Sequence, residues 1–524
     1  MVPISTRELG SPSTYIELAD LAGWEREFPG GDKGGSFNKN MAMNWLQRLA
    51  AARGIYDPTN VRGRGAWTDD GRCVVHLGDR LIVDGAEMKV HEIKSKYCYE
   101  AGRRMEGPAV EALSDEDGKK IVAVAEKFRW TRPGSHLLLA GWVALAPVCG
   151  ALKWRPHEWL TGSSGCGKTS IKNRYVKFLM SGVCLNAQGN STEAGIRNSL
   201  KSDALPVIFD ESEKQNTKDE ARVQAIIALA RQASSDDDAR TLKGTPNGDG
   251  MGFLIRSMVC FASIQVGLKY DADKNRITCL HLKKGRNAAA FAEWPKIDAA
   301  MKSLEADKTM PARLLRRTIN LLPITLQNIR TFSEVASRRF SDPRFGDQYG
   351  TLLAGAWSLI SSRLATAGEA EAFVDQYDWT HFLEDSTGDG GDEPDRAINA
   401  ILQSRVRLPN GQQLTISDLI AAAHGKPNKG APQVNVEGAS HELKMCGIRV
   451  VPEKNGEPAS LLIEVGNQEI TKMLKETPFQ NGWDDQLRRF EGAEDYRKPN
   501  GEKHKVRFAG PPDARDQGET VGPP

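Results

Sequence analysis

Nine residues near the middle of the chain constrain its fold more than any other stretch. Residues 162–170 have the sequence GSSGCGKTS, which fits the pattern G-x-x-x-x-G-K-[ST] without a mismatch. Glycines at these positions (Gly162, Gly165 and Gly167) let backbone N–H groups curl around phosphate oxygens in conformations that a Cβ would forbid. The pattern therefore predicts a phosphate-binding loop at the start of a helix.

The side chains of this loop are suited to hold a magnesium triphosphate. Lys168 supplies a mobile positive charge for the β and γ phosphates, and the Thr169 hydroxyl is a hard oxygen ligand for Mg²⁺. We expect the whole loop to contact the nucleotide through Gly162, Ser163, Ser164, Gly165, Cys166, Gly167, Lys168, Thr169 and Ser170. The predicted cofactors are thus a nucleoside triphosphate and Mg²⁺.

The flanking residues supply the strand and the helix that such a loop requires. His157–Thr161 is interpreted as a short buried strand, and Ser170–Leu179 repeats apolar residues at helical spacing. From Ser114 onward, helical and strand patterns alternate, which is typical of a parallel sheet with crossover helices. We therefore predict an α/β fold around the loop.

A later apolar strand ends in two acids. Leu205–Glu211 has the sequence LPVIFDE, in which only the last two residues are charged. One parallel sheet brings the ends of this strand and of the loop's strand to the same edge. We predict that Asp210 holds Mg²⁺, usually through water, and that Glu211 positions and deprotonates the attacking water. Alone, the pair could also be a solvated acidic strand end.

Two further predicted strands carry polar residues at their ends. Arg256–Gln265 is an apolar run that ends in Ser263 and Gln265, where a polar side chain can sense the γ-phosphate. Ile277–Leu282 follows Arg276, whose guanidinium could stabilise transition-state charge on the nucleotide of a neighbouring subunit. The alternative for this arginine is an ordinary surface position.

A β-hairpin is predicted after the acidic strand. Residues 239–245 and 252–257 flank the turn-rich sequence PNGDGM. Lys243, with Arg240 nearby, could contact successive phosphates of a nucleic acid as point charges. A solvated hairpin is the alternative interpretation, and the acidic run 236–238 would repel a phosphate backbone unless it faces away from it.

The order of these motifs resembles that of the AAA+ ATPases. Within them the chain is most similar to superfamily 3 helicases, specifically the helicase module of phage and prophage primase-helicase proteins. The residues that carry the resemblance are 145–170, 188–213 and 255–278. Gln265 stands where the family usually has an asparagine as its first sensor, which preserves the amide and lengthens the arm.

The resemblance implies an ATP-dependent DNA helicase or translocase of a phage or mobile-element replication system in the bacterial cytoplasm. Such proteins assemble as rings, here expected to be hexamers on single-stranded or forked DNA, in which Arg276 completes a neighbour's site and the hairpin grips DNA. A separate primase or polymerase is an expected partner, because residues 1–110 lack the paired acids of a priming domain. Two alternatives stay open: an initiator or loader that binds DNA without unwinding it, and an ATPase that remodels proteins or acts in defence.

At 524 residues the chain is too long for one hydrophobic core. We predict a P-loop AAA+-type parallel sheet with flanking helices, accompanied by smaller domains on either side. The predicted boundaries are 1–110 for a small N-terminal α+β adaptor domain, 114–300 for the ATPase domain, 301–387 for a helical domain, 392–510 for a winged-helix-like domain and 511–524 for a disordered tail.

Two of the flanking domains carry basic residues of interest. In the helical domain, Pro311–Leu322 repeats apolar residues at helical spacing, and its arginines form either a solvated basic face or a second sensor. These arginines are Arg313, Arg316 and Arg317. In the winged-helix-like domain, a protein-docking surface and a nucleic-acid surface are equally compatible with Arg405, Arg407, Lys426 and Lys429.

The composition of the chain bears on which classes of protein it can belong to. The eight cysteines include no C-x-x-C pair, which argues against a zinc ribbon and for reduced thiols in the cytosol. The net charge is only +2, so affinity for nucleic acid must come from a local basic surface. The apolar run His136–Leu152 contains Pro147 and Gly150, and it favours a buried helix over a membrane span.

Overall fold

The computed structural model describes a large part of the chain, which divides into two compact units. The described residues are 4, 8–30, 36–52, 60–210, 217–235, 241–244, 250–285, 288–387, 393–425, 434–452, 460–475, 477–490, 493–496 and 505–509. The first unit is drawn from 1–266 and 276–377, and the second from 267–275 and 378–524.

A five-stranded parallel sheet lies in the first unit. Its strands are β7 (His157–Gly162), β8 (Leu185–Gln188), β9 (Val207–Asp210), β12 (Val259–Ser263) and β13 (Ile277–Leu282). Their order across the sheet is β13-β7-β12-β9-β8, and every neighbouring pair is parallel. The predicted parallel α/β sheet is confirmed, and it is consistent with a P-loop AAA+ fold.

Strand β7, between β13 and β12, is held by packing and by hydrogen bonds to its neighbours. The Trp159 ring stacks on Phe261 of β12 with centroids 4.8 Å apart. The backbone N–H of Val259 donates to Nδ1 of His157 over 3.0 Å, and Nε2 of the same ring lies 2.6 Å from the carbonyl of Ala230. Burial lowers the pKa of His157 to about 3, so the ring is neutral and Nε2 carries the donated proton.

Helices follow the strands as crossovers. After β7 come α6 (Lys168–Ile171), a π-helical turn (Lys172–Val176) and α7 (Lys177–Leu179); after β8 and β9 come α8 (Glu193–Leu200) and α9 (Thr217–Ala233). The Thr192 side chain accepts a hydrogen bond from the N–H of Gly195 and so caps the start of α8. The hairpin is also confirmed, as β10 (Thr241–Gly244) pairs antiparallel with β11 (Gly250–Phe253).

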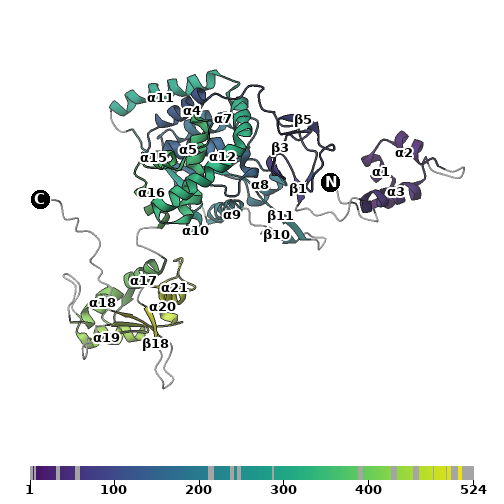
Figure 1. Ribbon diagram of the computed structural model, residues 1–524. Helices are drawn as coiled ribbons and strands as arrows, with labels where there is room; N and C mark the ends of the chain where they lie inside the picture. The colour runs from purple at the N-terminus through teal and green to yellow at the C-terminus, as the bar shows by residue number, and fades with distance from the viewer. Residues whose placement is uncertain are drawn as a thin grey trace. The chain divides into compact units, whose positions relative to one another are not determined.

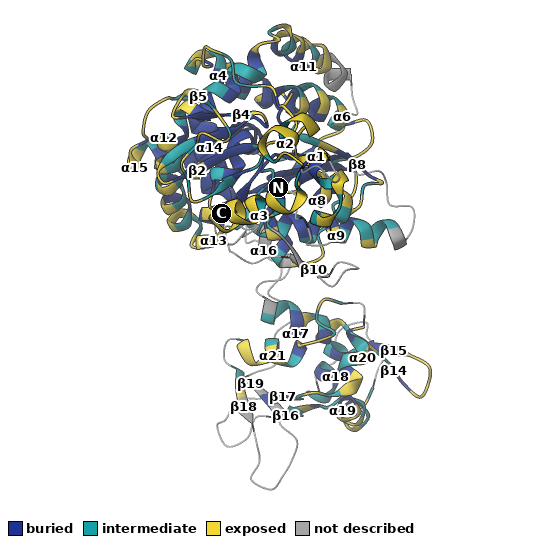
Figure 2. Cartoon of the chain, turned by 90° about the vertical axis from the view of Figure 1, so that its right-hand side faces the viewer, coloured by how far each residue is buried: buried dark blue, intermediate teal, exposed yellow. Residues whose placement is uncertain are grey.

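A layer of helices packs beside the sheet (Figure 1). It contains α4 (Asp115–Glu126), α5 (Ser135–Leu145) with the 3₁₀ turn Ala146–Ala151, α11 (Ala288–Ala306), α12 (Met310–Phe340), α13 (Pro343–Phe345), the π-helical turn Gly346–Gly350, α14 (Thr351–Ile360) and α15 (Ala367–Val374). Every residue of α5 is buried, and Figure 2 shows the same interior in dark blue. The predicted buried helix is therefore confirmed. None of the helices in the described part of the chain has the length and apolar content needed to cross a bilayer.

The arginines of α12 were expected to form a solvated face or a second sensor, and a solvated face is wrong for Arg317. Arg317 is buried, and it donates to the carbonyl of Leu113 over 2.9 Å and to Asp115 over 2.6 Å. Arg313 pairs with Asp117 at 2.8 Å, while Arg316 donates to the carbonyl of Ala109 over 2.6 Å. The helix pattern could not show this, because these four partners lie about two hundred positions away in the sequence.

The N-terminal part of the first unit contains helices and a β-meander. The elements are η1 (Glu8–Gly10), α1 (Pro12–Leu18), α2 (Leu21–Glu27), α3 (Lys39–Ala52), β1 (Val61–Arg62), β2 (Gly65–Asp69), β3 (Arg72–His76), β4 (Arg80–Val83), β5 (Ala86–Lys89) and β6 (Cys98–Tyr99). The helices bury Tyr15, Trp24 and Phe37 among themselves. The meander is joined to the region of the parallel sheet, since Arg64 donates to Asp203, between α8 and β9, over 2.5–2.9 Å.

The second unit has its own hydrophobic core and combines helices with a four-stranded antiparallel sheet of order β16-β17-β19-β18. Its elements are α10 (Asp271–Lys274), α16 (Thr380–Thr387), α17 (Glu393–Gln403), β14 (Arg405–Arg407), β15 (Gln413–Thr415), α18 (Ile416–Ala423), α19 (Val436–Met445), β16 (Ile448–Val451), β17 (Ser460–Glu464), α20 (Gln468–Met473), α21 (Trp483–Arg489), β18 (Ala493–Tyr496) and β19 (Lys505–Ala509). Arg405 and Arg407 are exposed on β14, whereas Lys426 and Lys429 lie outside the described residues.

The contact between α5 and α14 gives a prediction about stability. A Cβ on Gly141 would lie 1.8 Å from the carbonyl oxygen of Leu352, so Gly141→Ala must push the two buried helices apart. We expect a loss of about 1–3 kcal/mol in unfolding free energy. Thermal denaturation followed by circular dichroism measures it. Gly368→Ala is the control, because nothing lies within 4 Å of its added methyl; equal melting temperatures for both variants would contradict the prediction.

Candidate functional site

The phosphate-loop sequence lies between a strand and a helix, as the motif requires. β7 ends at Gly162 and α6 begins at Lys168. The φ angles of Gly162, Gly165 and Gly167 are 152°, 80° and 96°, a region that side chains with a Cβ rarely adopt. A Cβ on Gly162 would in addition lie 2.7 Å from the carbonyl oxygen of Leu282. The glycines are therefore required by the backbone path of this loop.

The lysine of the motif folds back against the loop that precedes it. The Lys168 ammonium donates to the carbonyl of Gly162, and it lies 3.4 Å from the carbonyl of Ser163. Ser163, Ser164 and the Thr169 side chain beyond them are exposed. The loop thus presents its charge and its hydroxyls on an accessible surface.

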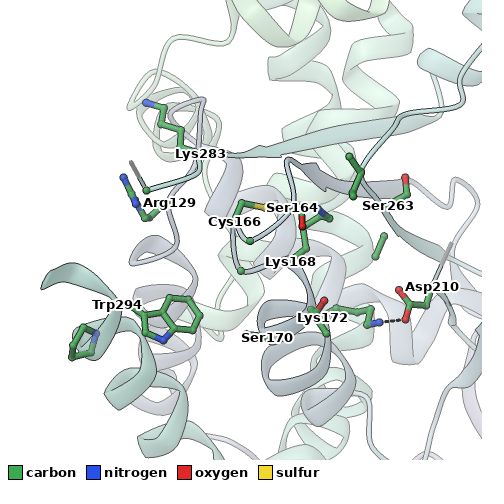
Figure 3. A pocket seen from close by; sticks show the side chains of 17 residues that line it. Arg129, Ser164, Cys166, Lys168, Ser170, Lys172, Asp210, Ser263, Lys283 and Trp294 are labelled. Carbon is green, nitrogen blue, oxygen red and sulfur yellow. Dashed lines mark hydrogen bonds and ion pairs between the residues drawn. The ribbon is translucent and has the colours of Figure 1, made fainter. Parts of the chain in front are cut away.

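The loop forms one wall of a cavity of about 720 Å³ (Figure 3). Loop residues 164–170 line it together with residues from six other stretches of the chain. Those residues are Arg129, Lys172, Asp210, Ala262, Ser263, Ile264, Lys283, Gly285, Trp294 and Pro295. A cavity of this size is in the range that holds one small ligand or cofactor.

Two of the predicted metal ligands share this cavity. Thr169 and Asp210 both line it, although they belong to different strand-and-helix pairs. Their hydroxyl and carboxylate oxygens are the donors that Mg²⁺ prefers, and Mg²⁺ commonly completes its shell with water and phosphate oxygens. The donor set therefore fits Mg²⁺. Glu211 lies outside the described residues.

A lysine that the motif analysis missed binds the acidic strand end. Lys172 forms an ion pair with Oδ2 of Asp210, and its side chain is only 7% exposed while that of Asp210 is 53% exposed (Figure 3). Lys172 begins the π-helical turn after α6. A cation that binds Asp210 must therefore compete with this ammonium. In the sequence, only the position of Lys172 one helical turn after Lys168 hints at its place.

The polar end of β12 contributes Ser263 to the cavity. The indole N–H of Trp159 donates to the Ser263 hydroxyl over 2.8 Å, and that hydroxyl donates to the carbonyl of Gln265 over 2.6 Å. Gln265 is exposed and is not one of the residues that line the cavity. The sequence analysis expected a sensor at Gln265, whereas the side chain that lines the cavity at this strand end is Ser263.

Arg276 lies at the far edge of the sheet from the phosphate loop. In the β13–β7 pairing, Ile277 is opposite His157 and Leu282 is opposite Gly162. The arginine before Ile277 is thus separated from the loop by roughly 16 Å of strand. Its guanidinium carbon lies 5.7 Å from the ring centroid of Trp154. Arg276 is therefore too distant to touch a nucleotide on its own loop.

Of the two residues that were expected to contact nucleic acid, one lies in a described strand of the hairpin. Lys243 is on β10, opposite Met251 of β11, and Arg240 lies outside the described residues. Elsewhere, within the residues that the structure describes, no group of three or more His, Cys, Asp and Glu side chains is placed to hold a metal ion.

Three more residues that line the cavity belong to no sequence motif: Arg129, Lys283 and Trp294. Arg129 follows α4, and its carbonyl accepts a hydrogen bond from the N–H of Lys283 over 2.7 Å. Its guanidinium lies 3.3 Å from Glu293 of α11, the helix that also carries Trp294. These residues come from three segments, so no local pattern could have brought them together.

Comparisons with known proteins find similar solved structures only at low TM-scores. No protein-family model matches the chain, and no curated protein matches it significantly. An apo structure of the NrS-1 C-terminal region matches 89% of this chain and 99% of its own, with 10% identity and a TM-score of 0.30. A mutant of Thermotoga maritima RuvB matches 66% of this chain and 94% of its own, with 13% identity and a TM-score of 0.21. At such scores these likenesses carry no argument about function.

The ion pair at the acidic strand end predicts how a divalent cation binds. In Lys172→Met the competing ammonium is gone, so the Asp210 carboxylate becomes free for a metal. We expect Mn²⁺ to bind about five times more tightly, equivalent to roughly 1 kcal/mol. Calorimetric titration with Mn²⁺ measures it, and Asp210→Asn in the same background should remove the gain. Unchanged or weaker binding to Lys172→Met would show that Lys172 does not compete with the cation.

Proposed function

We propose that the chain is an Mg²⁺-dependent ATPase that drives a DNA helicase or translocase of a phage or mobile-element replication system. The observation that supports this most strongly is that the phosphate loop and Asp210 line one cavity at the carboxyl edge of a parallel sheet. Ligands of open α/β sheets bind at this edge. A glycine loop, a lysine and an acidic strand end in one cavity together suit a nucleoside triphosphate.

The residues of the loop bind and orient the triphosphate in this proposal. Lys168 holds the β and γ phosphates, and the backbone N–H groups from Gly162 to Ser170 surround the phosphate oxygens. Thr169 and Asp210 would hold Mg²⁺, which neutralises charge on the transferred phosphoryl group when it is bound. Glu211, the next residue after Asp210, would take a proton from the attacking water.

Arg276 acts on a neighbouring subunit in the proposed assembly, a ring that is expected to be a hexamer. Its distance from the loop of its own chain supports a role only across an interface. An arginine supplied in trans stabilises charge in the transition state of phosphoryl transfer. Each site would then require two subunits.

DNA would be gripped by the hairpin β10–β11, through Lys243 and Arg240. A single-stranded or forked substrate is proposed, with priming or synthesis left to a separate primase or polymerase. A second candidate function is an initiator or loader that binds DNA without unwinding it. The second unit favours this alternative, because it has a core of its own and exposes Arg405 and Arg407 on β14.

A forked DNA duplex tests the proposed function and separates it from the alternative. The full chain should hydrolyse ATP and release the displaced strand, because hydrolysis is coupled to movement along DNA. Lys168→Ala should lose about 100-fold or more in turnover, since the charge on the phosphates is gone. Lys243→Ala should keep its basal ATPase and lose the stimulation by DNA.

The readouts are phosphate release and fluorescence of a labelled strand. ATP hydrolysis without strand release would support the loader instead. Full turnover by Lys168→Ala would remove the phosphate loop from the active site and contradict both functions.

Mixed subunits test the role of Arg276. Arg276→Ala and Lys168→Ala should each be inactive alone, because one lacks the arginine and the other lacks a working loop. When the two are mixed, some interfaces combine an intact loop with an intact arginine, so up to about one quarter of the ATPase should return. Phosphate release is measured over a series of mixing ratios. No recovery at any ratio would show that Arg276 does not act across an interface.

A further inference from the structure

The cavity extends past the phosphate loop to Trp294, which no motif assigns. This residue of α11 is 39% exposed and lines the cavity together with Pro295. Figure 3 places its ring on the opposite side of Lys168 from Asp210. A Cβ on Gly167 would lie 3.1 Å from the edge of the indole, so the ring borders directly on the last glycine of the loop.

The helix that carries this ring is fastened on both sides of it. One residue before the tryptophan, Glu293 lies 3.3 Å from the guanidinium of Arg129. Four residues after it, Asp298 accepts from Arg174 over 2.6 Å, and Glu305 accepts from the same arginine over 2.7 Å. These bonds to Glu305 and Asp298 raise the pKa of Arg174 and keep it charged. Arg174 belongs to the π-helical turn after the loop, so these bonds tie α11 to the segment that follows the loop.

The two sides of the cavity differ in chemistry. The side of Asp210, Lys172 and Thr169 offers oxygen donors and a cation, which suit phosphates and a metal ion. The other side offers the apolar faces of Trp294 and Pro295, with the cations of Arg129 and Lys283 near them (Figure 3). A nucleoside triphosphate has the same division, with a charged tail and a flat ring. A ring that is already held in place stacks on a base at little entropic cost.

We propose that Trp294 is the platform on which the base of the bound nucleotide stacks, and that it favours purines because of their larger face. This inference rests on the proposed nucleotide-binding function. It assigns nucleotide selectivity to α11, a helix outside the strand–loop–helix motif.

The proposal is tested by comparing the affinity for a whole nucleotide with the affinity for its phosphate tail alone. The full chain, Trp294→Ala and Trp294→Phe are titrated calorimetrically with ATP, CTP and inorganic tripolyphosphate, each with Mg²⁺. We expect Trp294→Ala to bind ATP roughly 5- to 150-fold more weakly, and to bind tripolyphosphate as the natural chain does. Trp294→Phe should keep most of the affinity, and the preference for ATP over CTP should shrink in Trp294→Ala. Trp45→Ala is the matched control, because Trp45 is similarly exposed at 45% and does not line the cavity.

Three results would overturn the proposal, and they differ from one another. Unchanged ATP affinity in Trp294→Ala would show that the indole does not contact the base. Equal losses for ATP and tripolyphosphate would show that the ring only supports the loop. If the natural chain bound neither ligand, the proposed nucleotide site itself would be wrong, whereas binding of both with no effect of Trp294→Ala would overturn only the base platform.

Discussion

Parallel pairing of β7 with β12 on one side and β13 on the other is the constraint on which the site depends. Residues 157–161 of β7 are all buried, and the strand packs through Trp159, whose ring stacks on Phe261 of β12. The neutral ring of His157 adds hydrogen bonds to β12 and to α9. Because these contacts set the direction and register of β7, they determine where Gly162 ends the strand and where the loop begins.

The same sheet concentrates positive charge at its carboxyl edge. Lys168 and Lys172 follow β7, and Lys283 follows β13. Among the described residues that line this cavity, Asp210 is the one carboxylate, and Lys172 binds it. A highly charged anion is therefore attracted into the cavity, while a divalent cation is better accommodated together with the anion's own oxygens than alone.

Much of the core could be predicted from local patterns. The loop, its flanking strand and the strand ending in Asp210 are each continuous in sequence, so their residue types reveal them directly. The ion pair of Lys172 and the placement of Trp294 could not be predicted in this way. They depend on which segments the sheet brings together, and nothing near either residue in the sequence records its partner. The arginines of α12 illustrate the same limit, since a polar helix face looks alike whether it meets water or buried carbonyl groups.

The position of Arg276 has a consequence for assembly. The phosphate loop follows the carboxyl end of β7, whereas this arginine precedes the amino end of the neighbouring strand β13. A contact that joins the loop of one copy to the arginine of another must therefore use two different surfaces. After two copies have joined in this heterologous way, the pair still exposes one surface with a phosphate loop and one surface with Arg276. Successive copies then either close into a cycle or continue as an open filament, and the angle between neighbours decides which.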